Sequence, residues 1–319
     1  MSGPPDFVGI GTHLAGGWWW ADLLGAHPQV HPPADGEWSQ EFFSPFCARP
    51  MQDADVVAYH ARFPRPAAGV VGEWSPRYLY DAWTLPLLRR AAPDAKLLVL
   101  LRDPIERYQS ALSYRLAEER RHGKWVSMTD VVNRGRYASQ LEALYAFFAP
   151  EQVLVLQYEQ CLAEPQAQYE RTLAFLGVDA TILPRGVRRL QRRQARPGVA
   201  RRAIAALDLE RSAPAEWVRR VRTGRPRVHV ELWPDLLAAL RFELQPEVAA
   251  LARLAPEVDV RRWSGFQEAD PAGAAADAAR RERRPLLDTT RARVAAAGLA
   301  LAGLMGAAAG ILAATTELF

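Results

Sequence analysis

The sequence predicts an α/β fold of three layers, in which helices cover both faces of a central, mostly parallel sheet. Short apolar runs without alternation are typical of strands that are buried on both faces. The segments between these runs have the pattern of amphipathic helices, and strand–helix alternation is typical of parallel sheets. The expected strands are 6–12, 68–74, 95–103 and 151–159, and the expected helices are roughly 18–26, 79–92, 104–121, 135–149 and 165–176.

The composition favours one large globular domain with appendages, because the chain has 319 residues and 49% hydrophobic content. Its formal net charge of +4 is too small to predict a nucleic-acid partner. Cys47 and Cys161 are the only cysteines and lack metal-ligand spacing, so we expect no metal and a reducing compartment. The start, "MSGPPDF", has no basic and apolar segment, so we expect no signal peptide.

Three parts of the chain differ in composition. Residues 1–265 carry the α/β pattern, and residues 266–293 form a charged, alanine-rich segment that is typical of a linker. Residues 294–314 contain no charged side chain over 21 positions, which is long enough for a helix to cross a membrane. Gly306 and Gly310 form a GxxxG pattern that favours helix pairing. The alternative is a helix outside a membrane that packs on the domain or on a partner.

A spanning helix at 294–314 would leave the main domain on the cytoplasmic side, because arginines gather before it. These arginines are Arg280, Arg281, Arg283, Arg284, Arg291 and Arg293. The sequence does not predict the oligomeric state.

The strongest motif is "KLLVLLRDPIERYQSALSYRL" at 96–116. Its buried strand ends near Arg102, and Pro104 suits the first turn of the helix that follows. Arg102 therefore lies at the carboxyl edge of the sheet, where open α/β folds bind ligands. Ser110 follows two turns into the helix. A guanidinium and a hydroxyl in this arrangement can hold one phosphate group.

This motif resembles the 3′-phosphate-binding segment of sulfotransferases that use 3′-phosphoadenosine 5′-phosphosulfate (PAPS), whose pattern is Arg-Asp-Pro, Glu-Arg and a serine on the same helix. Further segments resemble the family in the same order, and the resemblance spans roughly 6–265. It is nearest to bacterial and heparan-sulfate-type sulfotransferases. The further segments are "HPQV" (27–30), "GEWSPRYLYD" (72–81), 135–178 and "LARLAPEVDVRRW" (251–263).

The resemblance implies a P-loop-like sheet and transfer of a sulfuryl group from PAPS, without a metal, to a hydroxyl or an amine. It implies that Arg102 and Ser110 hold the 3′-phosphate and that Tyr137 lies near the nucleotide. Arg193 and Arg196, beside the Pro-Gly of a basic loop, are candidates for a further phosphate contact.

The first strand is followed by "GTHLAGGWWWADLL" (11–24), which occupies the place of the family's 5′-phosphosulfate loop. Relatives usually have a cation and two hydroxyl residues here. In this chain Leu14 stands at the cation position, and Gly17 and Trp18 stand at the hydroxyl positions. Backbone N–H groups of Ala15, Gly16 and Gly17 remain to bind a phosphate at the helix start. Loss of one charge-stabilising group typically costs about 10²–10³ in rate.

Two residues are candidates for the missing chemistry. His13 is adjacent to the empty cation position. Relatives of the heparan type carry a glutamate as general base before a phenylalanine. In "EWSQEFFSPF" (37–46), an ungapped match puts Ser39 in its place, whereas a shift of two residues puts Glu41 there.

The three tryptophans at 18–20 cannot all face one core, so we expect one to pack inward and one to line a cleft. The alternative is plain packing. An aromatic cleft suits an apolar, aromatic or glycan acceptor, and a glycan, a lipid or a small metabolite all remain open. Three functions stay open: an active sulfotransferase, an inactive relative that binds nucleotide or acceptor, and a membrane-tethered interaction protein.

Overall fold

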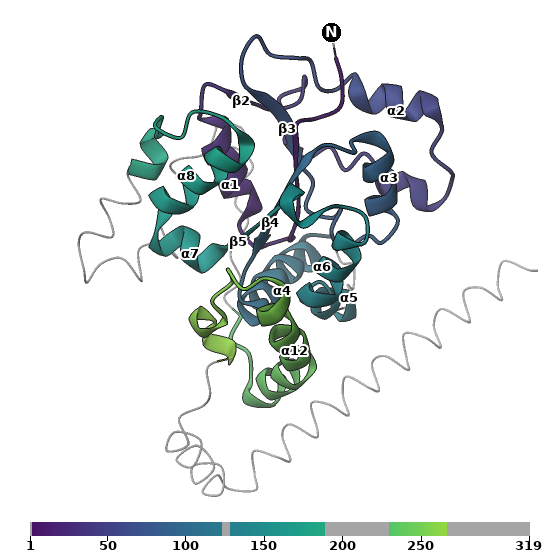
Figure 1. Ribbon diagram of the computed structural model, residues 1–319. Helices are drawn as coiled ribbons and strands as arrows, with labels where there is room; N and C mark the ends of the chain where they lie inside the picture. The colour runs from purple at the N-terminus through teal and green to yellow at the C-terminus, as the bar shows by residue number, and fades with distance from the viewer. Residues whose placement is uncertain (1, 123–127, 189–229, 267–319) are drawn as a thin grey trace, which may run out of the picture. The chain divides into compact units, whose positions relative to one another are not determined.

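The computed structural model describes residues 2–122, 128–188 and 230–266. Five parallel strands form one sheet in the order β2-β3-β1-β4-β5, with helices on both faces, so the predicted α/β fold class is confirmed (Figure 1). The strands are β1 (Phe7–Gly11), β2 (Val30–His31), β3 (Val70–Trp74), β4 (Lys96–Leu101) and β5 (Val153–Gln157).

The helices follow the strands in alternation, as the hydrophobic pattern predicts. Those within 2–188 are α1 (Gly17–Gly25), α2 (Asp53–His60), α3 (Thr84–Ala91), α4 (Pro104–His122), α5 (Thr129–Asn133), α6 (Tyr137–Tyr145), α7 (Tyr158–Ala163) and α8 (Pro165–Leu176). The long helix α12 (Pro234–Leu254) comes later in the chain. Short 3₁₀ turns are η1 (Ser44–Cys47), η2 (Pro150–Gln152), η3 (Val260–Arg262) and η4 (Ser264–Phe266).

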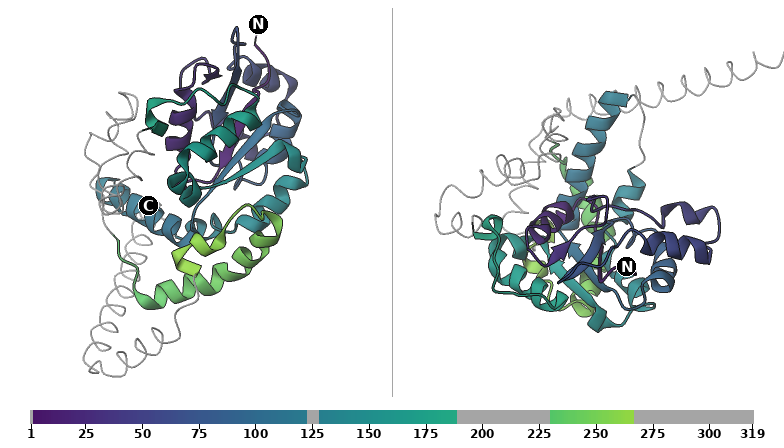
Figure 2. Two further views of the ribbon diagram at one scale, coloured as in Figure 1. Left: turned by 60° about the vertical axis from the view of Figure 1, so that its left-hand side comes forward. Right: turned by 90° about the horizontal axis from the view of Figure 1, so that it is seen from above.

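Two packed cores lie on opposite faces of the sheet because side chains alternate along each strand. On β3, Val71 belongs to the core that also holds the inner side chains of α3 and α6. Trp74 belongs to the core beneath α1 and α8. Figures 1 and 2 show α1, α7 and α8 on one side of the sheet and α2, α3 and α6 on the other.

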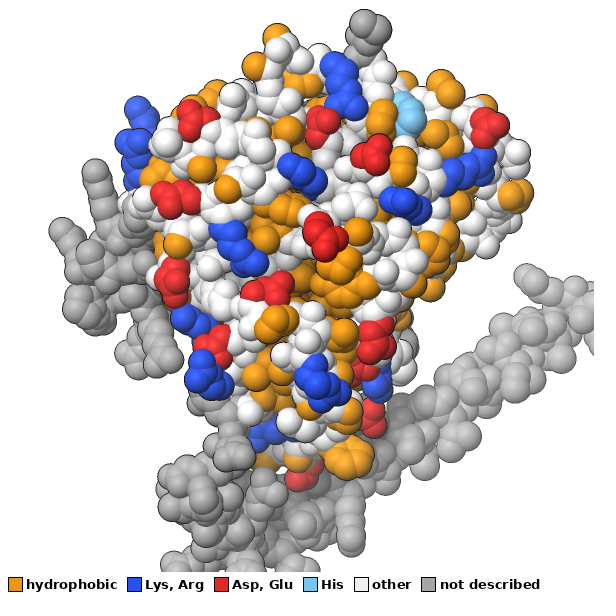
Figure 3. Space-filling model, viewed as in Figure 1, with side chains coloured by type: hydrophobic (Ala, Val, Ile, Leu, Met, Phe, Trp, Pro, Cys, Tyr) orange, Lys and Arg blue, Asp and Glu red, His pale blue; other side chains and the backbone are white. Residues whose placement is uncertain are grey.

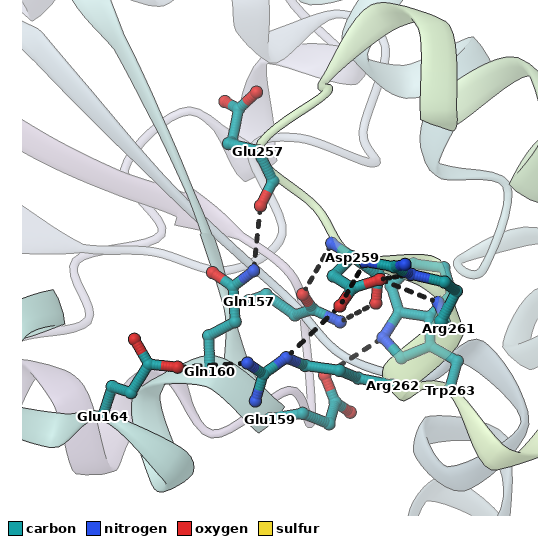
Figure 4. Close-up of polar contacts among 9 residues, drawn as sticks. All are labelled: Gln157, Glu159, Gln160, Glu164, Glu257, Asp259, Arg261, Arg262 and Trp263. Carbon is teal, nitrogen blue, oxygen red and sulfur yellow. Dashed lines mark hydrogen bonds and ion pairs between the residues drawn. The ribbon is translucent and has the colours of Figure 1, made fainter.

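The last described turns of the chain return to β5 and α7 (Figure 4). The Gln157 side chain donates to the Asp259 carbonyl at 3.0 Å and accepts from the Asp259 N–H at 2.9 Å. The Trp263 indole N–H donates to the Glu159 carboxylate at 3.0 Å, and Trp263 is fully buried. These contacts fasten the end of the described domain to an edge strand of the sheet.

Several sequence predictions fall on residues that the structure does not describe. Arg193 and Arg196 lie in the undescribed segment 189–229, and the candidate membrane helix 294–314 lies in the undescribed segment 267–319. Among the described helices, none combines the length and the apolar character that a membrane span requires.

Candidate active site

Arg102 and Ser110 meet where β4 gives way to α4. The Arg102 Nη1 donates to Ser110 Oγ at 3.0 Å, and Nη2 lies 2.9 Å from Glu106 Oε2. The Arg102 Nε is buried without a hydrogen-bond partner. Its side chain is 20% exposed, so one part of the guanidinium faces outward while the rest is held. A cation and a hydroxyl thus lie side by side at the carboxyl edge of the sheet, which is the geometry a phosphate group needs.

The backbone at this edge is fixed by two hydroxyl groups. The Tyr137 hydroxyl, at the start of α6, donates to the Arg102 carbonyl at 2.9 Å. The Thr12 hydroxyl, just after β1, donates to the Leu100 carbonyl at 3.0 Å. Both tyrosine and threonine are buried, so Tyr137 acts on the position of Arg102 through the backbone.

The first loop ends at a helix start without a side-chain cap. Gly16 occupies the N-cap position with a φ of 95°, a left-handed conformation that suits glycine. No side chain caps α1, and its first turn holds no acidic residue. The N–H groups of Gly17 and Trp18 therefore lie at an uncapped helix N-terminus, which attracts anions.

Tyr158 joins the first loop to Arg102. Its ring lies under the Arg102 guanidinium, with 4.9 Å between the guanidinium carbon and the ring centroid. A Cβ added to Gly16 would approach the same ring to 2.7 Å. The two predicted phosphate contacts, far apart in sequence, thus both lie against one aromatic ring.

Trp74 fills the space beside the first loop. Its ring is fully buried, and a Cβ on Gly17 would lie 2.3 Å from the indole nitrogen. That nitrogen has no hydrogen-bond partner. A hydroxyl side chain at position 17 would collide with the indole, so the indole explains the glycine at a position where relatives carry a hydroxyl.

Leu14 and His13 complete the first loop. Leu14 has a φ of 66° and packs against the apolar cluster of Ile105 and Tyr108. Burial, followed by the positive charge of Arg134 and other arginines, lowers the pKa of His13 to about 4. The imidazole is therefore neutral near pH 7 and brings no positive charge to the cation position.

Glu41 lies in the segment between β2 and η1 and has a φ of 43°. Among the described non-glycine residues, only Leu14 and Glu41 have a positive φ, and such backbone strain concentrates at functional sites. Burial raises the pKa of Glu41, and the positive charge of Arg77 opposes that rise. Arg77 also lowers the pKa of His13, so the electrostatic field of one arginine reaches both candidate catalytic residues.

The three tryptophans of α1 have different surroundings. Trp20 is fully buried, and Trp18 is 40% exposed. Trp19 packs edge-on against Trp20 and Tyr158, with ring centroids 5.3 and 5.9 Å apart. Trp20 is the inward tryptophan expected from the sequence, a tryptophan that lines a cleft stays a prediction, and Trp19 supports the ring that lies under Arg102.

Part of the chain matches a known protein family. Residues 49–181 match the model of a sulfotransferase family. The matched segment covers less than half of the chain. It contains Arg102, Ser110 and Tyr137, and it begins after the first loop and Glu41. No curated protein sequence matches the chain.

One solved sulfotransferase shares the fold, and two others align with lower scores. The crystal structure of the sulfotransferase from Alicyclobacillus acidocaldarius aligns with a TM-score of 0.54 and 22% identity, covering 81% of this chain and 98% of that chain. Sulfotransferase STF9 from Mycobacterium avium aligns with a TM-score of 0.49 and 11% identity over 78% of this chain and 77% of its own. Mouse sulfotransferase SULT7A1, complexed with PAP, aligns with a TM-score of 0.45 and 10% identity, covering 81% of this chain and 91% of its own.

The described surface is mixed in charge on the face that Figure 3 shows. On the face shown in Figure 3, basic and acidic side chains are interspersed with apolar ones. Within the described ranges, no group of three His, Cys, Asp or Glu side chains has a metal-binding arrangement.

Sequence reasoning missed two residues of the site. Tyr158 follows β5 at the carboxyl edge, and that place is the signal that could have identified it. Trp74 gives no such signal, because its contact with Gly17 joins positions from separate elements. Glu73 lies in the segment 72–81 that resembles the family, but the sequence does not predict that its buried carboxyl accepts hydrogen bonds from three hydroxyl groups.

Proposed function

We propose that the protein transfers the sulfuryl group of PAPS to a hydroxyl or an amine of an acceptor. The observation that carries this proposal is that Arg102, which contacts Ser110, and Gly16 at the uncapped start of α1 both lie against the ring of Tyr158. Two anion sites on one sheet edge suit a nucleotide with phosphates at both ends of its ribose. The sulfotransferase fold and family segment support the same chemistry.

Each part of the site has a proposed role in this reaction. Arg102 and Ser110 hold the 3′-phosphate, and the N–H groups from Gly16 to Trp18 hold the 5′-phosphosulfate. Arg193 and Arg196, outside the described residues, remain candidates for a further 3′-phosphate contact. The helix start stabilises the negative charge that grows on the leaving phosphate oxygen.

Glu41 is the proposed general base. It takes the proton from the acceptor hydroxyl while the acceptor oxygen forms a bond to sulfur and the bond from sulfur to the phosphate oxygen breaks. Its raised pKa favours this role, because a base works best when its pKa approaches the working pH. His13 is the second candidate, since its neutral imidazole can accept a proton at neutral pH.

A second candidate function is nucleotide binding without transfer. It is favoured by the apolar packing of Leu14 at the cation position and by the indole of Trp74 beside Gly17. The two functions share the Arg102 site and differ in the fate of the sulfuryl group.

A transfer assay separates them. The full chain is incubated with PAPS carrying ³⁵S and with panels of glycans, lipids and small hydroxyl or amine compounds, with Arg102→Ala as the control variant. Acceptor-dependent label transfer that Arg102→Ala abolishes supports the sulfotransferase function. Tight binding of 3′,5′-adenosine bisphosphate without transfer to any acceptor supports the second function, and absence of binding contradicts both. A lipid acceptor and membrane association through 294–314 remain predictions of the sequence.

A further inference from the structure

Glu73 is a carboxyl group inside the core of the sheet. It lies on β3 on the same face as Val71 and is fully buried. No arginine or lysine of the described ranges forms an ion pair with it, and its hydrogen-bond partners there are hydroxyl groups. Burying a carboxyl group without a neighbouring cation costs desolvation free energy. The hydrogen bonds to Glu73 must therefore offset much of this cost.

Three hydroxyl groups donate to Glu73. The Tyr59 hydroxyl lies 2.5 Å from Oε1, the Ser75 hydroxyl 2.6 Å from Oε2, and the Tyr78 hydroxyl 3.4 Å from Oε2. When Glu73 is ionised, its carboxylate only accepts hydrogen bonds, so it fixes the direction in which each hydroxyl proton points.

Ser75 links Glu73 to the backbone of residues 40 and 41. A serine hydroxyl has one proton and two lone pairs. The proton points to Glu73, and the oxygen accepts the N–H groups of Gln40 at 3.1 Å and Glu41 at 3.0 Å. The hydrogen-bonding capacity of Ser75 is therefore fully used.

Tyr78 does the same for the next residue. Its hydroxyl oxygen accepts the Phe42 N–H at 2.7 Å, the shortest of these backbone contacts. Three consecutive N–H groups, at residues 40–42, are thus held by oxygen atoms whose protons point to Glu73. Glu41, in the middle, has the strained left-handed backbone.

We propose that Glu73 is a positioning residue that holds the backbone of residues 40–42, and with it Glu41, through the hydroxyl groups of Ser75 and Tyr78. It does not contact the acceptor itself. The structural part depends only on the hydrogen bonds above, whereas its consequence for catalysis rests on the proposed function of Glu41.

Amide hydrogen exchange tests the structural part. The double variant Glu73→Leu with Tyr59→Phe replaces both partners of one buried hydrogen bond by apolar groups, which limits the loss of stability. Tyr59→Phe alone is the matched control, because Tyr59 contacts Glu73 but is not hydrogen-bonded to residues 40–42. We expect the Gln40 and Glu41 amides to exchange about tenfold faster in the double variant and within about twofold of wild type in the control.

Glu73→Gln should keep most of the protection, because an amide oxygen can accept the Ser75 proton. Unchanged exchange at Gln40 and Glu41 in a folded double variant would overturn the proposal. If the double variant does not fold, Ser75→Ala decides instead. This variant removes the only link between Glu73 and these two amides, and unchanged exchange there would overturn the proposal equally.

The transfer assay tests the catalytic part. We expect kcat of the double variant to fall about 10- to 100-fold, because small displacements of a catalytic group have effects of that size. The affinity for 3′,5′-adenosine bisphosphate should stay within about twofold, and Glu73→Gln should recover most of kcat. Faster amide exchange with an unchanged kcat would overturn the positioning role. A wild-type protein without transfer activity would contradict the proposed function and leave the exchange result to decide the structural part.

Discussion

At the scale of single residues, the first loop depends on contacts that its own sequence does not contain. The indole of Trp74 lies where a side chain of residue 17 would project, and the ring of Tyr158 lies where a side chain of residue 16 would project. Glycine at both positions therefore follows from packing as much as from phosphate binding. A search for hydroxyl residues in the loop cannot detect this, because the cause lies on β3 and α7.

Gly17→Ala tests the contact with Trp74. The added methyl group would lie 2.3 Å from the indole nitrogen, and overpacking of this kind costs about 1–3 kcal/mol. Urea denaturation should show this loss of stability. In the background of Trp74→Leu, which is itself destabilising, the added loss from Gly17→Ala should shrink, since residues in contact are coupled. Additive effects would show that the indole does not restrict position 17.

The buried carboxyl of Glu73 predicts a pH dependence of stability. Burial raises its pKa from 4.5 to about 7 in the folded chain. Between these values the folded state holds a proton that the unfolded state has released, so this contribution to stability is lost as pH rises from about 4.5 to 7. Between pH 5 and pH 8, wild type should lose on the order of 3 kcal/mol relative to Glu73→Gln. Parallel pH profiles of the two proteins in urea denaturation would contradict this.

At the scale of elements, the sequence predicts most of the site-bearing structure. The continuous apolar runs at 95–103 and 151–159 predict β4 and β5, and Pro104 predicts the start of α4. The sequence does not predict the two-residue strand β2 or the helix α2. Strand β2 is too short to show a hydrophobic pattern, and α2 is largely exposed and so lacks a clear apolar face. Arg102 and Ser110 were predictable since one strand–helix unit carries both. Trp74 was not, because a tertiary contact alone places it in the site, whereas the place of Tyr158 directly after β5 could have identified it.

Asp103 connects the start of α4 to the end of the described chain. Its carboxylate accepts the Ile105 N–H at 2.9 Å and the Gly265 N–H at 3.0 Å. Asp103→Ala leaves both N–H groups without this acceptor, so we expect a loss of about 1–3 kcal/mol. Asp103→Asn should lose less, because its oxygen can still cap α4. Thermal unfolding measures which variant loses more stability, and equal losses for both variants would contradict the capping role.

At the scale of the whole molecule, the segment that ends at Trp263 completes the core of the described domain. Trp263 comes from the last described turns, yet it is fully buried and bonded to Glu159 at the start of α7. The family resemblance in the sequence includes the segment 251–263, which ends at Trp263, whereas the contact with α7 needed the structure. The domain therefore depends on residues about a hundred positions apart.

Two tryptophans provide a matched test of this dependence. Trp263→Ala should lower the free energy of unfolding by about 3–5 kcal/mol, as is typical for a buried aromatic side chain. Trp233→Ala is the control, because Trp233 is 59% exposed and should change stability by less than about 0.5 kcal/mol. Similar effects of the two substitutions would show that the chain end is not part of the core.

The central claim is that Arg102 and Ser110 recognise a 3′-phosphate. The most direct measurement is calorimetric titration of the full chain with 3′,5′-adenosine bisphosphate and with adenosine 5′-monophosphate, for wild type and for Arg102→Ala. We predict that wild type binds the bisphosphate more tightly by about 2–5 kcal/mol, as for other hydrogen-bonded charge contacts that lose a partner, and that Arg102→Ala removes most of this difference. Equal affinities of wild type for the two nucleotides would contradict the account.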